Sequence, residues 1–444
     1  MERALGLPPD LKEGGYTVSE EDKFDVIIIG AGPAGIACAY TLAKEGRNVL
    51  VIERGDTAGS KNVTGGRFYT YALDLVEPGL WKEAALERKV TREQIMMMAG
   101  DRSVKIDYSD PSFSGEGEMP QSFTILRAVF DQWFAAMAEE QGAIIACGIK
   151  VDGLIGENGR ITGVRAGGDE MFADLVIAAD GVNSMIAREA GLVPELSGET
   201  IGVGVKEIIE LPAKTIEERF GLKPGEGASL LILGCTEGIH GGGFLYTNNE
   251  SVSLGCVFTP SEAGEHGKQV HDIFQELKMH PAIYPLIEGG KTVEYGAHLV
   301  REEGFRGIPK KLYRDGLIVI GEAAGFVMNI GYTIRGIDLA IVSGVAAARA
   351  VISGKEPGPA YLEELKKINL LPSMKAVDGY FDLLEIPRMY AAYPKVASGI
   401  FNSMYSVNSE VPSGMIKRIR GVLKENGISL WSLIKDGIRG YRSI

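Results

Sequence analysis

Apolar and polar positions near the start of the chain predict a strand, a helix and a second strand. Phe24–Ile29 is a short run rich in β-branched residues, typical of a parallel strand buried on both faces. The small residues that follow, through about Gly46, predict a helix. Residues 48–52 predict the next strand, which ends at Glu53. Strand, helix and strand in this order indicate a βαβ unit.

Later blocks extend this pattern. Residues 174–178 and 316–320 each predict a further buried strand, and residues 334–352, dense in glycine and alanine, predict a helix packed closely on a sheet. Residues 197–310 contain stretches that alternate with the period of two expected of antiparallel strands. The chain from residue 357 onward is mostly helical in its pattern. A parallel sheet is therefore expected to carry an inserted antiparallel one.

A glycine-rich turn, Gly30-Ala31-Gly32-Pro33-Ala34-Gly35, joins the first strand to the helix. We expect Gly30 to make the tight turn, Gly32 to let the backbone approach a pyrophosphate, and Gly35 to let helix and strand pack closely. The helix N-terminus offers free N–H groups to phosphates. Glu53, 18 residues after Gly35, can accept hydrogen bonds from both ribose hydroxyls, whereas it would repel a 2′-phosphate. The turn predicts FAD or NAD rather than NADP.

Two acidic turns, Asp180-Gly181 and Gly321-Glu322, follow later predicted strands. Together with the first glycine turn they resemble the flavoprotein family typified by aromatic hydroxylases, in which the late acid holds the flavin ribityl chain. Here that acid is Glu322 rather than aspartate. Arg127 also matches the family, whose arginine at this place lies near the cofactor; a solvated residue at a helix start is the alternative. The resemblance implies a tightly held FAD.

Longer strings are similar to electron-transfer flavoprotein–quinone oxidoreductases. They are residues 202–207, 240–246, 280–290, 294–297 and 304–310. Residues 61–67 and 331–338 are most similar to the short bacterial branch of that family, the C subunit of the nitrogen-fixation-type electron-transfer flavoprotein complex. Geranylgeranyl reductases are more distant relatives.

The four cysteines, Cys38, Cys147, Cys235 and Cys256, stand far apart and form no CxxC pair. Their spacing excludes a disulfide scaffold, a cysteine-based zinc site and an iron–sulfur cluster held by this chain alone, and no metal site is predicted. Full-length quinone oxidoreductases carry their own iron–sulfur domain. The resemblance to the short branch therefore implies a separate ferredoxin-like subunit, together with a two-subunit electron-transfer flavoprotein (alpha and beta) that oxidises NADH and bifurcates electrons.

The resemblance implies an FAD-dependent oxidoreductase that passes these electrons to membrane quinone. In the relatives a glycine pair before a Phe–Leu–Tyr strand lines the quinone slot, which places that slot at Gly241 and Gly242. His240 stands where the relatives have tyrosine and could relay a proton; a loop histidine without a role is the alternative. The competing functions are a geranylgeranyl-reductase-type reductase of lipid alkenes, a hydroxylase and a docking subunit with structural FAD. The reductase family's cysteine motif near the flavin is absent from residues 61–66.

The distribution of charge along the chain indicates which kinds of partner it can bind. Forty-six Lys and Arg against 59 Asp and Glu give a net charge of −13, which argues against nucleic-acid binding. The last 30 residues are basic, and Trp431, Ile434, Ile438 and Tyr441 recur there at steps of three and four. This pattern is typical of a helix lying on an anionic lipid surface; an acidic partner and a plain solvated face are alternatives.

No targeting or spanning segment is expected. The first 23 residues are acidic and lack an apolar core, unlike a signal peptide. No stretch approaches about 18 uninterrupted apolar residues. We expect a cytoplasmic protein that is peripheral on the cytoplasmic face of the cell membrane.

Together the patterns predict an α/β fold. It has a Rossmann-type FAD-binding domain of the glutathione-reductase and aromatic-hydroxylase type, an inserted mixed antiparallel-sheet substrate domain and a helical C-terminal region. The expected division is an acidic extension (1–23), the FAD-binding domain (24–196 and 315–352), the quinone domain (197–314) and the helical region (353–444). The predicted cofactor-binding residues are Gly30, Gly32, Pro33, Ala34, Gly35, Glu53, Arg54, Gly65, Gly66, Arg67, Arg127, Asp180, Gly181, Gly321, Glu322 and Gly331.

Overall fold

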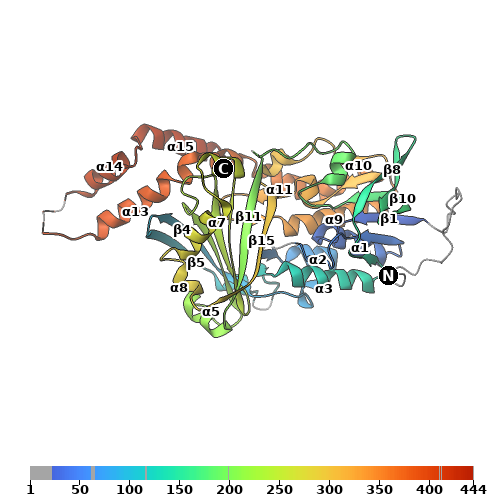
Figure 1. The fold of residues 1–444 in the computed structure, drawn as a ribbon, viewed down its shortest axis with the longest axis horizontal. Helices are drawn as coiled ribbons and strands as arrows, with labels where there is room; N and C mark the ends of the chain where they lie inside the picture. The colour runs from blue at the N-terminus through green and yellow to red at the C-terminus, as the bar shows by residue number, and fades with distance from the viewer. Residues whose placement is uncertain are drawn as a thin grey trace.

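A computed structural model describes residues 23–61, 66–115, 118–198, 200–409, 411 and 413–443. The acidic extension before Lys23 and the predicted cofactor residue Gly65 lie outside the described residues. Figure 1 shows an elongated molecule, with a parallel sheet and its helices at one end, a tall second sheet in the middle and a helical arm at the other end.

The first sheet has the strand order β16-β17-β10-β1-β2-β7. Parallel pairing joins the four central strands, so their carboxyl ends lie along one edge. The predicted strands are confirmed with small shifts of their bounds. The strands of this sheet and its attached hairpin are β1 (Phe24–Ile29), β2 (Val49–Ile52), β7 (Ile144–Ala146), β8 (Val151–Glu157), β9 (Arg160–Ala166), β10 (Asp169–Ala178), β16 (Tyr313–Arg314) and β17 (Leu317–Val319).

Helices α1 (Pro33–Lys44) and α9 (Ile337–Ile352) pack against each other beside this sheet. Gly344 makes the close approach possible, because a Cβ there would lie 2.2 Å from the carbonyl oxygen of Ala34. Both helices are almost entirely buried, as their content of small apolar residues predicts. This packing holds the N-terminus of α1, at Pro33, close to the carboxyl end of β1, at Ile29.

The second sheet has the strand order β15-β11-β14-β13-β12-β4-β6-β3, with β5 paired to β4. Its strands are β3 (Arg67–Tyr69), β4 (Lys89–Ala99), β5 (Arg102–Ser109), β6 (Ser122–Thr124), β11 (Ile201–Glu210), β12 (Glu226–Leu233), β13 (Gly241–Thr247), β14 (Ser251–Phe258) and β15 (Lys291–Arg301). Strands from residues 67–124, a segment assigned by sequence to the FAD-binding domain, thus join this sheet, because β4 pairs in parallel with β12. The two halves of the molecule are tied together by the chain crossing between the sheets.

Further helices cover the sheets and build the arm. They are α2 (Tyr71–Val76), α3 (Arg127–Glu140), α4 (Met185–Glu189), α5 (Ala213–Phe220), α6 (Pro260–Glu265), α7 (Val270–Met279), α8 (Tyr284–Ile287), α10 (Pro357–Lys367), α11 (Leu370–Ala376), α12 (Gly379–Leu384), α13 (Ala392–Tyr405), α14 (Met415–Glu425) and α15 (Leu430–Ser443). A small separate core, with Val396, Val422, Leu423 and Ile428, holds α13 to α14. The arm is tied back to the body by the ion pair of Arg388 with Asp436, whose Nε and Oδ2 atoms lie 2.6 Å apart.

Candidate functional site

A deep cavity lies where the carboxyl edge of the parallel sheet meets the second sheet. Gly30 after β1, Glu53 after β2, Asp180 after β10 and Gly321 after β17 line its first wall. The opposite wall comes from the second sheet, including Phe244, Tyr246, Val257, His298 and Val300. The carboxyl edge of an open α/β sheet is where such folds bind ligands.

The three glycines of the first turn differ in what demands them. Gly30 has φ +107°, and a Cβ there would lie 2.5 Å from the carbonyl oxygen of Ala179. A Cβ on Gly35 would lie 2.1 Å from the carbonyl oxygen of Gly30, so this residue serves the packing of helix on strand. A Cβ on Gly32 would meet no atom of the described residues within 4 Å. Protein packing therefore does not require glycine at position 32, which lines the cavity and leaves room for a ligand beside the start of α1.

Glu53 is held in place by the backbone. Its Oε2 accepts a hydrogen bond from the Ala31 N–H at 2.9 Å, and its Oε1 accepts one from the Gly55 N–H at 2.6 Å. Each carboxylate oxygen keeps a further lone pair for another donor. The side chain lines the cavity and is therefore presented as an acceptor to a ligand hydroxyl.

Two half-buried acids, Asp180 and Glu322, line the cavity further along the edge. The Asp180 Oδ2 accepts a hydrogen bond from the Ile186 N–H at 2.8 Å, whereas its Oδ1 is buried with no partner among the described residues. Burial raises the pKa of Asp180 to about 6 and that of Glu322 to about 7, although the Arg301 N–H and the charges of Arg127 and Arg301 lower the latter. Both carboxyls are thus poised to be satisfied by hydroxyl or N–H groups of a ligand.

Arg127 begins α3 and lines the cavity rather than standing in solvent. Its Nη2 donates to the Oδ2 of the fully buried Asp131 at 2.6 Å, and its Nε bridges both oxygens of that carboxylate. Because the partner is buried and the contact is bidentate, the guanidinium is held rigidly at the cavity wall. The alternative of a solvated arginine does not hold.

Arg301, at the end of β15, is a cavity residue that the sequence analysis did not select. It is 5% exposed, and its Nε and Nη2 are buried without hydrogen-bond partners among the described residues. A buried, unpaired guanidinium is costly unless a ligand satisfies it. No contiguous motif marks this residue, because the partner sheet supplies it to the cavity from the far end of a different strand.

These observations together test whether the residues fit FAD. A dinucleotide needs an open backbone approach at a helix N-terminus, an acceptor for a ribose, and donors for phosphate or carbonyl oxygens. Gly32, Glu53 and Arg301 supply these three features in one cavity. Orphaned polar atoms on Asp180 and Arg301 are of the kind that a polar ligand satisfies. The residues fit FAD.

The structure brings most of the predicted cofactor residues together. The predicted residues that line the cavity are Gly30, Gly32, Pro33, Ala34, Glu53, Arg54, Gly66, Arg67, Arg127, Asp180, Gly181, Gly321 and Glu322. Arg67 is paired with Glu93 and Ser122, so its charge is already compensated. Gly331 is not at the cavity: it lies in the turn between β18 (Met328–Asn329) and β19 (Ile334–Arg335), where its nearest neighbour is Leu384.

The predicted quinone residues lie apart from this cavity, at the start of β13. A Cβ on Gly241, whose φ is +147°, would lie 2.1 Å from the Val257 oxygen, and one on Gly242 would lie 2.7 Å from the Ile232 oxygen. Pairing with the neighbouring strands thus already demands both glycines. Phe244 and Tyr246, further along the same strand, do line the cavity. The strand therefore connects the two places.

Comparison with known proteins gives three family matches along the chain. An FAD binding domain model matches residues 23–218, a model described as ETF-QO, ubiquinone-binding, matches residues 201–300, and the ETF-QO/FixC family C-terminal domain matches residues 381–444. These matches bear out the prediction that FAD is the cofactor of an oxidoreductase, and they assign the C-terminal helices to the same family as the rest.

Full-length relatives agree. The chain is 42% identical to the probable electron transfer flavoprotein-quinone oxidoreductase YdiS of Escherichia coli, over 96% of this chain and all of that one. It is also 42% identical to the Escherichia coli protein FixC, over 95% of this chain and 99% of that one. Among solved structures, a geranylgeranyl bacteriochlorophyll reductase-like protein from Thermoplasma acidophilum has the same fold, with a TM-score of 0.69 at 20% identity over 91% of this chain and 96% of that one.

Proposed function

Because the chain belongs to the electron transfer flavoprotein–quinone oxidoreductase (ETF-QO)/FixC family, we propose that it is the FAD-containing subunit of an electron-bifurcating complex. In this proposal a two-subunit electron-transfer flavoprotein oxidises NADH, a separate ferredoxin-like subunit carries electrons onward, and this chain passes them to membrane quinone. The observation that carries the proposal is the cavity itself. One wall has the strand-end geometry of an FAD site, and the other belongs to the segment that matches the ubiquinone-binding model.

The predicted residues have separate tasks in this proposal. Gly32 and the start of α1 receive the pyrophosphate, Glu53 holds a ribose, and Glu322 and Asp180 hold hydroxyl or N–H groups. The bound FAD supplies chemistry at both the one-electron and two-electron levels, which links single-electron carriers to a quinone. The chain's own residues position it between the sheets and exclude water there.

The arrangement of the cysteines supports a separate iron–sulfur subunit. Cys38 is buried in the core of the first sheet, Cys235 and Cys256 share the core of the second sheet, and burial raises the pKa of each thiol. Within the described residues, no three His, Cys, Asp or Glu side chains are placed to hold a metal ion together. A cluster that delivers electrons to this chain would then be held by another subunit.

Quinone reduction is the step to test first. The reduced, purified holoprotein is mixed anaerobically with a short-tail menaquinone or ubiquinone analogue, and the visible flavin band is followed. We expect saturable reoxidation, and we expect His240→Ala to slow it by about tenfold or more, since a positioned proton donor contributes at least this much. His266→Ala, on an exposed histidine after α6, is the matched control and should react like the unaltered chain.

A second candidate is favoured by the solved geranylgeranyl reductase-like fold. If no analogue reoxidises the flavin in a saturable way, with or without the cluster subunit, the quinone function is wrong. The alkene-reductase function would then be tested with a geranylgeranyl lipid under the same anaerobic conditions. Reoxidation of the reduced flavin by that lipid, followed through the visible flavin band, would identify the substrate class.

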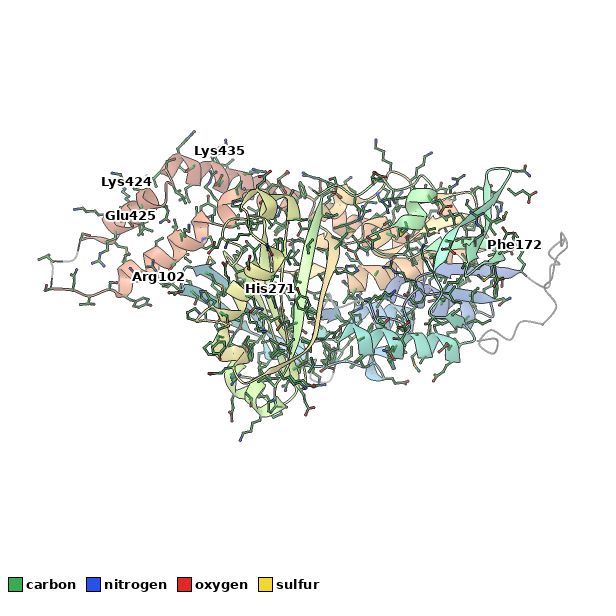
Figure 2. All side chains as sticks on the ribbon, in the orientation of Figure 1. Arg102, Phe172, His271, Lys424, Glu425 and Lys435 are labelled. Atoms are coloured by element: carbon green, nitrogen blue, oxygen red, sulfur yellow. The ribbon has the colours of Figure 1, made fainter. Side chains whose placement is uncertain are left out.

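We also propose peripheral contact with an anionic membrane surface. Trp431 is 75% exposed and Tyr441 86% exposed on the outer face of α15, where Lys435 and Arg439 stand beside them. In Figure 2 the labelled Lys424, Glu425 and Lys435 lie on the arm, at the end of the molecule away from the parallel sheet. Across the described residues, no helix has both the length and the apolar character required to cross a bilayer.

Liposome binding tests this contact. Because each basic residue near an anionic surface contributes about 1 kcal/mol, neutralising Lys435 and Arg439 to Gln should weaken binding about 30-fold in co-sedimentation. Lys214→Gln with Lys223→Gln, an exposed pair near α5, is the matched control. Equal co-sedimentation of both double variants would remove the membrane from the proposal and leave an acidic partner subunit or a solvated face.

A further inference from the structure

A carboxyl group with no hydrogen bond to any other described side chain or backbone group stands between the FAD cavity and the predicted quinone residues. Glu302 follows directly after β15 and lines the cavity. A Cβ on Gly202 would lie 2.8 Å from both the Glu302 Oε1 and the Val257 Cγ1, so the carboxyl group lies beside Val257. Val257 is the residue paired with Gly242 in the neighbouring strand. Glu302 therefore links the cavity to the start of β13.

Two acids contact His240, and the charges of the same two acids act on Glu302. The His240 N–H donates to the Glu262 Oε2 at 2.7 Å, and the His240 Nδ1 lies 3.7 Å from the Glu385 Oε1. Burial first, and then the negative charges of Glu385 and Glu262, raise the pKa of Glu302 to about 7. A carboxyl with such a pKa is present in both protonation states near neutrality, which is what proton exchange requires.

The ring of His240 is held from several sides. The backbone carbonyl oxygen of His240 accepts a hydrogen bond from the Thr259 N–H at 2.9 Å. The backbone N–H and the carbonyl oxygen of His240 are therefore both held by hydrogen bonds. The ring lies against that of Tyr390, with 4.7 Å between centroids, and the Tyr390 hydroxyl donates to the Leu384 oxygen at 2.7 Å. The His240 side chain is 20% exposed and that of Glu385 is 42% exposed, so this group reaches solvent.

We propose that Glu302 exchanges protons at the wall of the FAD cavity and is recharged from solvent through His240 and Glu385. Glu262 is a positioning residue that fixes the backbone of His240. The inference rests on the proposed function and deepens it, because it names the route by which quinone reduction obtains its protons. Tyr390 and Glu385 belong to the helical C-terminal region, which thereby completes the route.

The overall reaction balances with this route. One quinone gains two electrons and two protons and becomes a quinol, with two new O–H bonds. The electrons come from the electron-transfer flavoprotein partner through this chain's FAD, which ends the cycle as it began. The protons come from solvent water, and each passage leaves Glu302 deprotonated until His240 returns a proton to it.

The experiment compares reoxidation of the reduced holoprotein by a short-tail quinone analogue between about pH 5 and pH 9. The protonated form of Glu302 is the donor, so the rate of the unaltered chain should fall as the pH rises through about 7. Glu302→Gln keeps the shape and removes the proton, and we expect reoxidation about 100-fold slower and without that pH dependence. Glu303→Gln, the adjacent acid outside the FAD cavity, is the matched control and should keep both rate and profile.

Two further readouts separate proton transfer from damage to the fold. Ferricenium accepts an electron and no proton, so it should reoxidise Glu302→Gln as fast as the unaltered chain. The oxidised flavin spectrum, titrated without turnover, should show a transition near pH 7 that Glu302→Gln loses and Glu303→Gln retains. A slowed ferricenium reaction would overturn the proposal.

The outcomes distinguish this inference from the proposed function. If the unaltered chain reacts with quinone and Glu302→Gln shows the same rate and pH profile, the route is wrong and the function stands. If the unaltered chain does not react with quinone, the proposed function fails. The spectral titration then decides alone, and an identical transition in Glu302→Gln would overturn the assignment of Glu302.

Discussion

The two walls of the cavity are built on opposite principles. In the parallel sheet, Gly30, Glu53, Asp180 and Gly321 each stand at the end of a strand, so the wall is assembled from short contiguous motifs. The wall from the second sheet takes single residues from the middle or end of separate strands, of which Arg301 is an example. The parallel wall repeats a known ligand-binding geometry, whereas the other wall follows no such contiguous pattern.

Glycines of the first wall differ in the same way from the glycines at the start of β13, outside the cavity. Gly32 has open space where its Cβ would be, so packing among the described residues does not account for the missing side chain. Gly241 and Gly242 have backbone oxygens within 2.7 Å of theirs, so strand pairing accounts for them. A glycine in a resemblance motif is therefore a candidate ligand contact only where the structure leaves the space of its Cβ empty.

Among the changes considered, substitution of the first-turn glycines should have the largest effects on the free energy of unfolding. Gly30→Val forces a branched residue into φ +107° and against the Ala179 oxygen, and we expect it to lower the free energy of unfolding by about 3 kcal/mol or more. Gly32→Ala should leave the unfolding free energy of the FAD-free protein within about 0.5 kcal/mol, because φ is −86° and no atom is displaced. Urea unfolding of both variants measures this contrast.

The affinity for FAD should change in Gly32→Ala even though its stability does not. We expect Gly32→Ala to bind FAD at least about tenfold more weakly despite its normal stability, since its methyl group would occupy the phosphate approach. Quenching of flavin fluorescence on titration measures the affinity. Normal affinity together with normal stability would show that the ligand does not approach the backbone at Gly32.

The parallel wall could be predicted from the sequence almost completely. A buried strand, its terminal glycine or acid, and the following helix are adjacent in the chain, and the physics that joins them is local. The strand Phe24–Ile29 has the predicted bounds, and Glu53 and Arg127 line the cavity. The family resemblance added FAD and the electron-transfer relatives, both of which the comparisons confirm.

The second wall could not be predicted in the same way. Within residues 67–124, β4 pairs with β12, more than a hundred residues away, and no local pattern specifies which sheet this segment joins. The motif points to Gly331, yet this residue does not line the cavity, and a Cβ on it would lie 3.2 Å from the Leu384 side chain. Glu302 and Tyr390 acquire their meaning only when the C-terminal region packs beside β13, because their importance comes from burial and neighbours rather than from spacing.

Arg301 gives a smaller and sharper test of the second wall. Its Nε and Nη2 have no partner among the described residues, and burial lowers the pKa of this guanidinium. Arg301→Met keeps the length and removes a buried charge that has no hydrogen-bond partner at Nε or Nη2 among the described residues, so the FAD-free protein should become more stable by about 1 kcal/mol. The same change removes charge-assisted hydrogen bonds to the bound cofactor, so FAD should bind about tenfold more weakly.

For Arg301→Met we expect a gain in the stability of the FAD-free protein and a loss of FAD affinity, and these opposite changes make the result informative. A residue that only supports the sheet would lose stability in both the FAD-free and FAD-bound proteins when it is replaced. Thermal unfolding with and without FAD, together with the flavin titration, separates the two cases, and Arg306→Met, on an exposed arginine already paired with Asp378 and Asp382, is the control. A loss of stability without FAD in Arg301→Met would place this arginine among structural residues and leave only the parallel wall to bind the cofactor by charge.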